Sequence, residues 1–408
     1  MNSKKIIFII NIFLKTSLLR SEYDLTLIGR ITYADSMGRL PIWISEALKN
    51  ELKINIISVA KKPIDFNDIP TIVKEIINNP TSETGKVSLL LDHPWYTFNS
   101  PADYVPDSII KIAYSMLEAT KLPPQWVEIL NKKFDAIALP DKWLIKVYKN
   151  SGITVPLFVL AHGMYIEEFL SAPAKKKPNI PFIFGSSAGF WPWKNQLTLI
   201  EAFAQEFGNN KNIQLILHGR SGDPYYIKRK IKDLRATNIK VIFKSLNKKQ
   251  YFNFMTSLDC YILISKGEGF SLTPREALAL GLPCIISDNT AHHAICKTGY
   301  VYSVPAKIKA SAYYNALNCC CGYNFSCSIK DARQALREVY TNYEKYVSKA
   351  LQGRYWVKQY LKDNLAAQYL SLIKPAKVIL GDNNSIEKDC IITNSKDLYE
   401  KYLKIITS

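Results

Sequence analysis

The chain has 408 residues, which is enough for two domains of ordinary size because one hydrophobic core usually stops growing at about 250–300 residues. Apolar residues make up 48% and charged residues 22% of the chain, which argues against wholesale disorder and against a polytopic membrane protein. The net charge of +18 favours an anionic partner, but the basic residues form short clusters, most of which we expect to be solvated surface.

The beginning of the chain carries an apolar stretch, residues 6–14, behind Lys4 and Lys5. It resembles the core of a signal peptide, but it is too short to span a bilayer and no small-residue cleavage site follows cleanly. We therefore expect an extra strand, or a helix that lies on the domain or on a membrane surface. A peripheral contact with an anionic membrane surface stays open as a secondary partner.

The eight cysteines do not predict a metal site, because Cys319, Cys320 and Cys321 are adjacent and lack the spacing of zinc ligands. Cys260 and Cys284 lie in apolar runs, where a free cysteine behaves as a small hydrophobe, and this suits a reducing compartment. We expect a cytoplasmic protein, with association to the inner face of the membrane as an alternative.

Strand-like and helix-like runs alternate along the chain, which is typical of parallel sheets covered by helices. A first series has a helix at about 38–50, in which Pro41 suits the first turn, and a second series follows residue 180. The strands expected in the first series are 25–29, 54–59, 87–91, 136–139 and 155–160. The five strands expected in the second series are 181–185, 213–217, 239–243, 260–264 and 284–287, with helices at 194–207, 225–235, 248–257 and 274–280 between them.

The predicted fold class is therefore α/β, with two Rossmann-like doubly wound domains. Residues 171–179 combine proline with lysine and lack apolar periodicity, so we place the linker there. Beyond residue 308 the periodicity weakens, and it recovers in a helical stretch at about 336–372. The predicted segments are an apolar extension 1–21, a first domain 22–170, a second domain 180–345, a helix 346–374 and a polar tail 375–408. A return of the helix 346–374 to the first domain stays open.

The residues from Lys266 to Pro283 are the most informative part of the sequence. A strand ends, a glycine-flanked loop follows, and Thr273 begins a helix, so the backbone N–H groups of residues 270–272 (Phe270, Ser271 and Leu272, after Gly269) lie where a phosphate binds well. Thr273 and Glu276 also fit a capping box, which is the alternative explanation. Glu268 adds a second carboxylate, and carboxylates accept hydrogen bonds from the vicinal hydroxyls of sugars.

With two glutamates separated by seven residues, Glu268 and Glu276, this segment resembles the retaining glycosyltransferases of the GT-B architecture, family 4-like (glycosyl transferases group 1). The resemblance implies two domains facing across a cleft, an acceptor domain first and a nucleotide-sugar donor domain second. It implies that Glu268 contacts the donor sugar, that Glu276 holds the ribose hydroxyls and that the amides between them bind the β-phosphate. It also implies a nucleotide diphosphate sugar as co-substrate and no bound cofactor.

Two further segments extend the resemblance to about residues 25–305. Residues 189–203 are similar to the family's segment with a phosphate-binding lysine, which implies that role for Lys194. The family's usual arginine is missing near Gly185, so either Arg220 replaces it or diphosphate binding is weaker. In the first domain, the resemblance implies that Gly38 lets the backbone approach the phosphates or the acceptor and that Arg39 supplies charge.

Histidines supply the remaining candidates. His93 follows a strand and is expected to face the cleft as a catalytic residue, together with Glu268. His162 is expected to shape the hinge entrance. His292 and His293 follow a strand of the second domain, and the sequence does not separate lining the donor pocket from lying on the surface.

The predicted function is transfer of a hexose, with retention of configuration, to a glycan or lipid-linked hydroxyl in surface polysaccharide or lipopolysaccharide synthesis. No Asp-x-Asp motif is present, so we expect metal independence. A sugar-nucleotide epimerase or a glycan phosphorylase is an alternative, although no pyridoxal lysine is identified. A nucleic-acid-binding protein is a third, prompted only by the charge, and without an aromatic and basic module we expect no nucleic acid partner.

Overall fold

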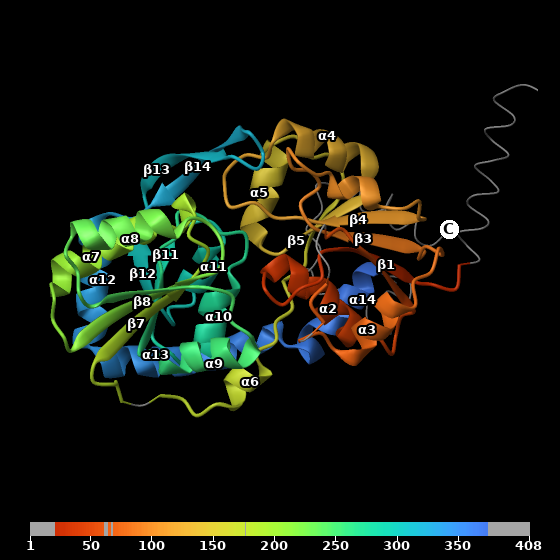
Figure 1. Ribbon diagram of the computed structural model, residues 1–408. Helices are drawn as coiled ribbons and strands as arrows, with labels where there is room; N and C mark the ends of the chain where they lie inside the picture. Colours follow the sequence, from red (N-terminus) through yellow and green to blue (C-terminus); the bar gives the residue numbers. More distant parts are fainter. Residues whose placement is uncertain (1–20, 61–63, 67, 176, 374–408) are drawn as a thin grey trace, which may run out of the picture.

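A computed structural model describes residues 21–60, 64–66, 68–175 and 177–373 (Figure 1). The apolar stretch 6–14 and the polar tail 375–408 lie outside the described residues. In the described part of the chain, no helix is both long enough and apolar enough to cross a membrane.

The N-terminal domain is built on a six-stranded parallel sheet of order β2-β1-β3-β4-β5-β6. Its strands are β1 Leu25–Gly29, β2 Ile54–Ser58, β3 Val87–Leu91, β4 Ile110–Tyr114, β5 Ala136–Leu139 and β6 Leu157–Val159. Its helical segments are α2 Ser36–Leu48, α3 Thr71–Asn78, η1 Pro101–Tyr104, α4 Pro124–Lys133, α5 Lys142–Asn150 and α6 Glu167–Ser171. The five predicted strands are present, and β4 is an additional strand. Asp35 caps α2 by accepting the N–H of Gly38 at 2.7 Å, so the helix begins two residues earlier than predicted.

The C-terminal domain repeats this plan with the parallel order β12-β11-β10-β7-β8-β9. Its strands are β7 Phe182–Ser187, β8 Ile213–Gly219, β9 Ile239–Phe243, β10 Cys260–Leu263, β11 Cys284–Asp288 and β12 Tyr302–Pro305. Its helical segments include η2 Pro192–Lys194, α7 Gln196–Phe207, α8 Pro224–Asp233, α9 Lys248–Ser257, α10 Leu272–Ala279 and α11 His292–Cys296. The prediction of five strands is wrong, because β12 pairs with β11 as a sixth. This strand has only four residues, two of them exposed, and so lacks a buried apolar run.

A hairpin of two antiparallel strands, β13 Ile308–Tyr314 and β14 Cys319–Ser326, follows where the predicted periodicity weakens. It reaches from the C-terminal domain to the N-terminal domain, as Figure 1 shows. There the N–H of Thr97 donates to the carbonyl of Ala316 at 3.0 Å, and the N–H of Lys121 donates to that of Cys321 at 3.0 Å. The hairpin therefore joins the two domains on one side of the molecule.

The last described helices join the domains on the other side. They are α12 Ile329–Thr341, α13 Tyr343–Trp356, η3 Val357–Tyr360 and α14 Lys362–Ile373, so the single stretch expected at 336–372 is interrupted. α14 packs against α2, where the rings of Trp43 and Tyr369 lie 5.1 Å apart. The Tyr369 hydroxyl donates to the carbonyl of Ala161 at 2.9 Å. The chain thus returns to its N-terminal domain before the described part ends.

Candidate active site

A cavity of about 1180 Å³ lies between the two domains. It is lined by loops that follow β1 and β4 in the first domain and β7, β8, β9 and β10 in the second. In parallel sheets of this kind, ligands bind at the carboxyl ends of the strands, and here two such edges face each other. Most of the residues singled out in the sequence meet in this cavity.

The loop between β10 and α10 forms one wall of the cavity. Ser271 has a left-handed backbone conformation, with φ of 71°, and α10 begins directly after it. The buried guanidinium of Arg275 reaches back and donates to the carbonyls of Phe270 and Ser271. The N–H groups of residues 270–272 donate to no described residue, so the positive end of α10 is open to the cavity.

The capping-box explanation for Glu276 is wrong. The Thr273 hydroxyl is engaged by Tyr261, whose hydroxyl donates to it at 2.5 Å. The carboxylate of Glu276 instead accepts from Arg39 Nη1 at 2.9 Å and from the Tyr251 hydroxyl at 2.6 Å. The carboxylate of Glu276 binds these two side-chain donors more strongly than it would bind a backbone N–H group at the helix start. Glu276 therefore points into the cavity between the domains.

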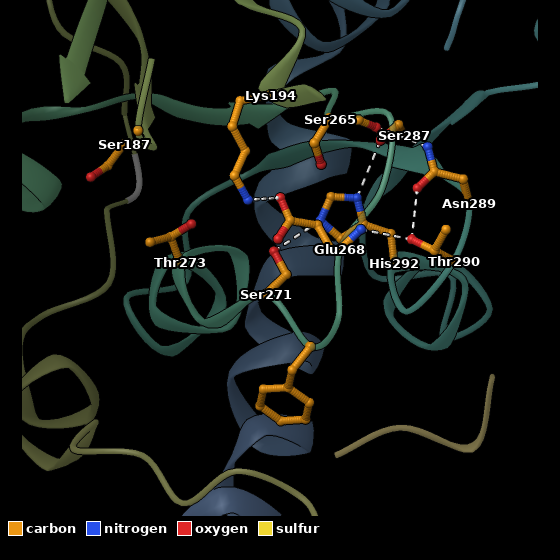
Figure 2. Close-up of polar contacts among 12 residues, drawn as sticks. Ser187, Lys194, Ser265, Glu268, Ser271, Thr273, Ser287, Asn289, Thr290 and His292 are labelled. Carbon is orange, nitrogen blue, oxygen red and sulfur yellow. Dashed lines mark hydrogen bonds and ion pairs between the residues drawn. The ribbon is translucent and has the colours of Figure 1, made fainter. Parts of the chain in front are cut away.

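Lys194 and Glu268 form an ion pair in the same wall, with Lys194 Nζ 2.6 Å from Glu268 Oε1 (Figure 2). Glu268 is 6% exposed, and its N–H donates to the Thr290 hydroxyl at 2.8 Å. Burial is the largest single influence and disfavours its ionisation, but the charge and hydrogen bond of Lys194, together with His292 and Ser265, lower the pKa of Glu268. Lys194 ends η2, just before α7, because Asn195 in a left-handed conformation separates the two helices.

The opposite wall carries arginines that pair with acidic groups. Asp35 Oδ2 is 3.1 Å from Arg30 Nη1 and 3.8 Å from Arg220 Nη2, so Arg220 of the second domain reaches a helix cap of the first. Together with the pair of Arg39 and Glu276, this gives two ion pairs across the cavity, each with an arginine from one domain and a carboxylate from the other.

Gly38 is not among the residues that line the cavity. A Cβ atom at this position would lie 2.4 Å from Cγ2 and 2.8 Å from the carbonyl oxygen of Thr32. The glycine is therefore required for the close approach of the first turn of α2 to the preceding loop, and Ser36 and Arg39 are the residues of α2 that reach the cavity.

The expectation that His93 faces the cleft is wrong, because it is not among the cavity-lining residues. Its ring packs against Trp126 at 4.7 Å and Tyr96 at 5.4 Å, and burial lowers its pKa to about 4. His162, expected at the hinge entrance, lines the cavity instead, with its ring stacked 6.0 Å from that of Phe270.

His292 supports the wall from behind. It is fully buried, with Nε2 2.9 Å from the Ser271 hydroxyl and Nδ1 3.2 Å from the Ser287 hydroxyl, as Figure 2 shows. Burial lowers its pKa to about 4, so the ring is neutral near neutral pH. His293 lies at the surface beside Asp288, at 2.8 Å. The two neighbouring histidines are thus separated: one positions Ser271 and the other is a surface residue.

Glu118 is a cavity residue that the sequence did not single out for a role. It follows β4, and its carbonyl oxygen would lie 2.0 Å from a Cβ atom at Gly267, so the two domains meet there without room for a side chain. Burial raises the pKa of Glu118, while the charge of Lys194 opposes that rise. The available signal was a carboxylate just after a strand, but Ile110–Tyr114 was not recognised as one.

Among the described residues, no group of three histidine, cysteine, aspartate or glutamate side chains is placed to hold a metal ion. The basic side chains that line the cavity are Arg30, Arg39, Lys194, Arg220, Lys248 and Lys249.

Sequence comparisons give two matches to known proteins. Residues 169–317 match the family model described as glycosyl transferases group 1. The chain is 20% identical over 284 residues to uncharacterized protein 356 of Sulfolobus islandicus rod-shaped virus 1, which covers 64% of this chain and 76% of that protein.

Solved structures show the same fold. HepE of Anabaena in complex with UDP-glucose superposes with a TM-score of 0.59 at 14% identity, over 87% of this chain and 99% of that one. TarM of S. aureus in complex with fondaparinux, α-GlcNAc-glycerol and UDP gives a TM-score of 0.52 at 12% identity, over 70% of this chain and 55% of that one. The chain thus spans about half the length of TarM and nearly all of HepE. Its two domains have the GT-B fold, and most of its second domain matches the family model of the glycosyl transferases group 1.

Proposed function

We propose that the protein transfers a hexose from a nucleotide diphosphate sugar to a hydroxyl of a glycan or of a lipid-linked acceptor. The observation that carries the proposal is that Lys194, Glu268, Glu276 and the open amides of residues 270–272 share one wall of the interdomain cavity. Amides at a helix N-terminus bind phosphate, and carboxylates bind the hydroxyl pairs of sugars. Arg39 and Tyr251 contact Glu276, and ribose hydroxyls would take their place.

The proposal includes retention of anomeric configuration. Glu268 is held in an ion pair with Lys194, which makes its carboxylate a poor nucleophile. We therefore propose that an oxygen of the leaving diphosphate accepts the proton of the acceptor hydroxyl. The bond between the acceptor oxygen and the sugar C1 forms on the face from which the C1–phosphate oxygen bond breaks. The anomeric configuration of a product, determined by NMR, tests this step: inversion would contradict it.

We also propose that the reaction needs no metal ion, because Lys194 and three arginines supply positive charge for a diphosphate. Turnover in excess EDTA should equal turnover with added Mg²⁺ or Mn²⁺. A loss of more than about tenfold on chelation, restored by either ion, would refute metal independence without touching the transfer itself.

The transfer is tested by incubating purified protein with UDP- and GDP-linked hexoses and N-acetylhexosamines, with glycan fragments or polyprenyl phosphate sugars as acceptors. Release of UDP or GDP that depends on one donor is expected. No release from any donor, with any acceptor, would overturn the proposed function. Phosphate-dependent sugar release from a glycan would instead point to a phosphorylase.

The acceptor is proposed to belong to surface polysaccharide or lipopolysaccharide synthesis at the inner face of a membrane. The net charge of +18 supports an attraction to anionic lipid. Cosedimentation with phosphatidylglycerol vesicles, but not with phosphatidylcholine vesicles, is expected. Equal recovery in both pellets would contradict an electrostatic contact.

A further inference from the structure

Two tryptophans lie side by side in the cavity wall, just before Lys194. Trp191 and Trp193 flank Pro192, and their rings are nearly parallel, with centroids 5.5 Å apart and an interplanar angle of 5°. Both line the cavity, and Trp191 is 41% exposed. An exposed tryptophan in a cavity is apolar surface that a ligand can cover.

The position of this pair is fixed by its surroundings. The Trp191 N–H donates to the carbonyl of Gly189 at 2.9 Å, and a Cβ atom at Gly189 would lie 2.7 Å from the Trp191 ring. The carbonyl of Trp193 accepts the N–H of Lys266 at 2.7 Å. On the other side of the pair, the Tyr314 ring of β13 packs 5.1 Å from that of Trp193.

Two buried polar groups at the tryptophan pair have no hydrogen-bond partner in the described part of the chain, one on Trp193 itself and one on the neighbouring Tyr314. Trp193 Nε1 and the Tyr314 hydroxyl are both buried and have no hydrogen-bond partner among the described residues. Glu118 lines the same cavity from the N-terminal domain, and its electrostatic neighbours include Lys194, Glu268 and Tyr314. Unpaired buried donors are costly, so each is a candidate to be satisfied by a ligand.

The location argues against the nucleobase as the occupant. Glu276 is engaged by Tyr251 of α9, whereas Trp193 is engaged by Tyr314 of β13. In Figure 1, α9 and the β13–β14 hairpin lie on opposite sides of the C-terminal domain. A donor with its ribose at Glu276 and its sugar at Glu268 therefore places its base away from the tryptophans.

We propose that Trp191, Trp193 and Glu118 form a subsite for a pyranose ring of a carbohydrate acceptor. The C–H face of a pyranose stacks on an indole, and its hydroxyls satisfy the indole N–H and the carboxylate. This inference rests on the proposed function, and it assigns a sugar, not a lipid alone, to the part of the acceptor next to the transferred hexose.

Direct binding to the full chain tests the subsite without requiring turnover. Maltotriose, chitotriose and mannotriose are titrated by calorimetry in the presence of UDP or GDP. At least one trisaccharide should bind the wild type, and Trp191→Ala should weaken that binding at least tenfold. Trp191→Phe, which keeps an aromatic face, should restore most of it, and Glu118→Gln should weaken it about fivefold.

Tyr225→Ala is the matched control, because Tyr225 is 61% exposed on α8 and does not line the cavity. It should bind the trisaccharide as the wild type does. The subsite is overturned if no trisaccharide binds the wild type, if Trp191→Ala binds it unchanged, or if the affinity for UDP or GDP falls in parallel, which would assign the tryptophans to the donor. If trisaccharide binding depends on Trp191 but no donor releases its nucleotide, the proposed function fails and the carbohydrate subsite stands.

Discussion

The two walls of the cavity are held in place differently. In the C-terminal wall, the supports of the binding loop come from the same domain: Arg275 holds two carbonyls, His292 contacts Ser271, and the N–H of Glu268 donates to Thr290. In the N-terminal wall, charged groups find partners across the cavity, as Arg39 does with Glu276. The binding loop of the first wall is therefore prearranged for a ligand, whereas a ligand must replace existing contacts at the two pairs that cross the cavity, Arg39 with Glu276 and Arg220 with Asp35.

The two kinds of support are expected to contribute differently to the free energy of binding. Groups fixed within one domain lose little freedom when a ligand arrives, so their interactions contribute fully. Groups paired across the cavity must first break an existing interaction. Only the difference in free energy between the new interaction with the ligand and the interaction that it replaces then contributes to binding. Changes in the C-terminal wall should thus have larger effects than equivalent changes in the N-terminal wall.

The largest effect is expected for Glu268→Gln. The amide keeps the shape of the side chain but removes its charge, which leaves Lys194 without its counter-ion and the sugar without a carboxylate. We expect turnover to fall by about 100-fold or more, within the range seen when one prearranged polar group is lost. Steady-state kinetics with the preferred donor measure this. The control is Glu201→Gln, because Glu201 pairs with Lys230 at 2.6 Å outside the cavity. A comparable loss of turnover in the control would show that the effect does not arise in the cavity.

Lys194→Met should reduce turnover by about 30-fold at neutral pH, as expected from the loss of one charge-assisted contact to phosphate. It should also shift the pH dependence. Lys194 lowers the pKa of Glu268 against the effect of burial, so that pKa rises when the lysine is removed. The acidic limb of the profile of kcat/KM against pH should then move to higher pH. An unmoved limb would mean that Glu268 does not need to be ionised for transfer.

The same contrast explains how much could be predicted from the sequence. The loop with Glu268 and Glu276 was recognised because its strand, glycines and helix are consecutive in the chain. The local pattern could not decide what Glu276 contacts, because Thr273 and Glu276 have the spacing of a capping box in either case. The outcome depends on Tyr261, Tyr251 and Arg39, which tertiary structure brings to the two side chains.

The N-terminal wall was harder to predict for a related reason. Its strand β4 was missed because Lys111 interrupts a short apolar run, and Glu118 then had no strand end to mark it. The position of His93 after a strand predicts that it faces the cleft, yet its ring packs against Trp126. The hairpin was also missed, because its residues alternate in burial only weakly. The features that could not be predicted depend on contacts with residues that are distant in the sequence.

Arg39→Ala tests the cross-cavity pairs and should have a smaller effect. The variant frees Glu276 for ribose but removes one positive charge near the diphosphate. We therefore expect the affinity for the nucleoside diphosphate to fall about tenfold relative to that for the free nucleoside, in keeping with one charge-assisted contact. Calorimetric titration of both ligands gives this ratio. An equal fall for both would mean that Arg39 acts on the shape of the site and not on the phosphates.

The smallest effect on transfer at neutral pH is expected for His292→Gln. This substitution should instead change how the stability of the protein depends on pH. His292 is buried with a pKa of about 4, below the value of about 6.5 for an unfolded chain. Between these values the unfolded state binds the extra proton, so the wild type should lose about 2 kcal/mol of stability from this group between about pH 7 and about pH 5. Glutamine does not titrate, so the stability difference between wild type and variant in urea unfolding should shrink as the pH falls. If the stabilities of wild type and variant change with pH in parallel, His292 is not held neutral in the folded protein. The loop at Ser271 would then not be prearranged by this contact within its own domain.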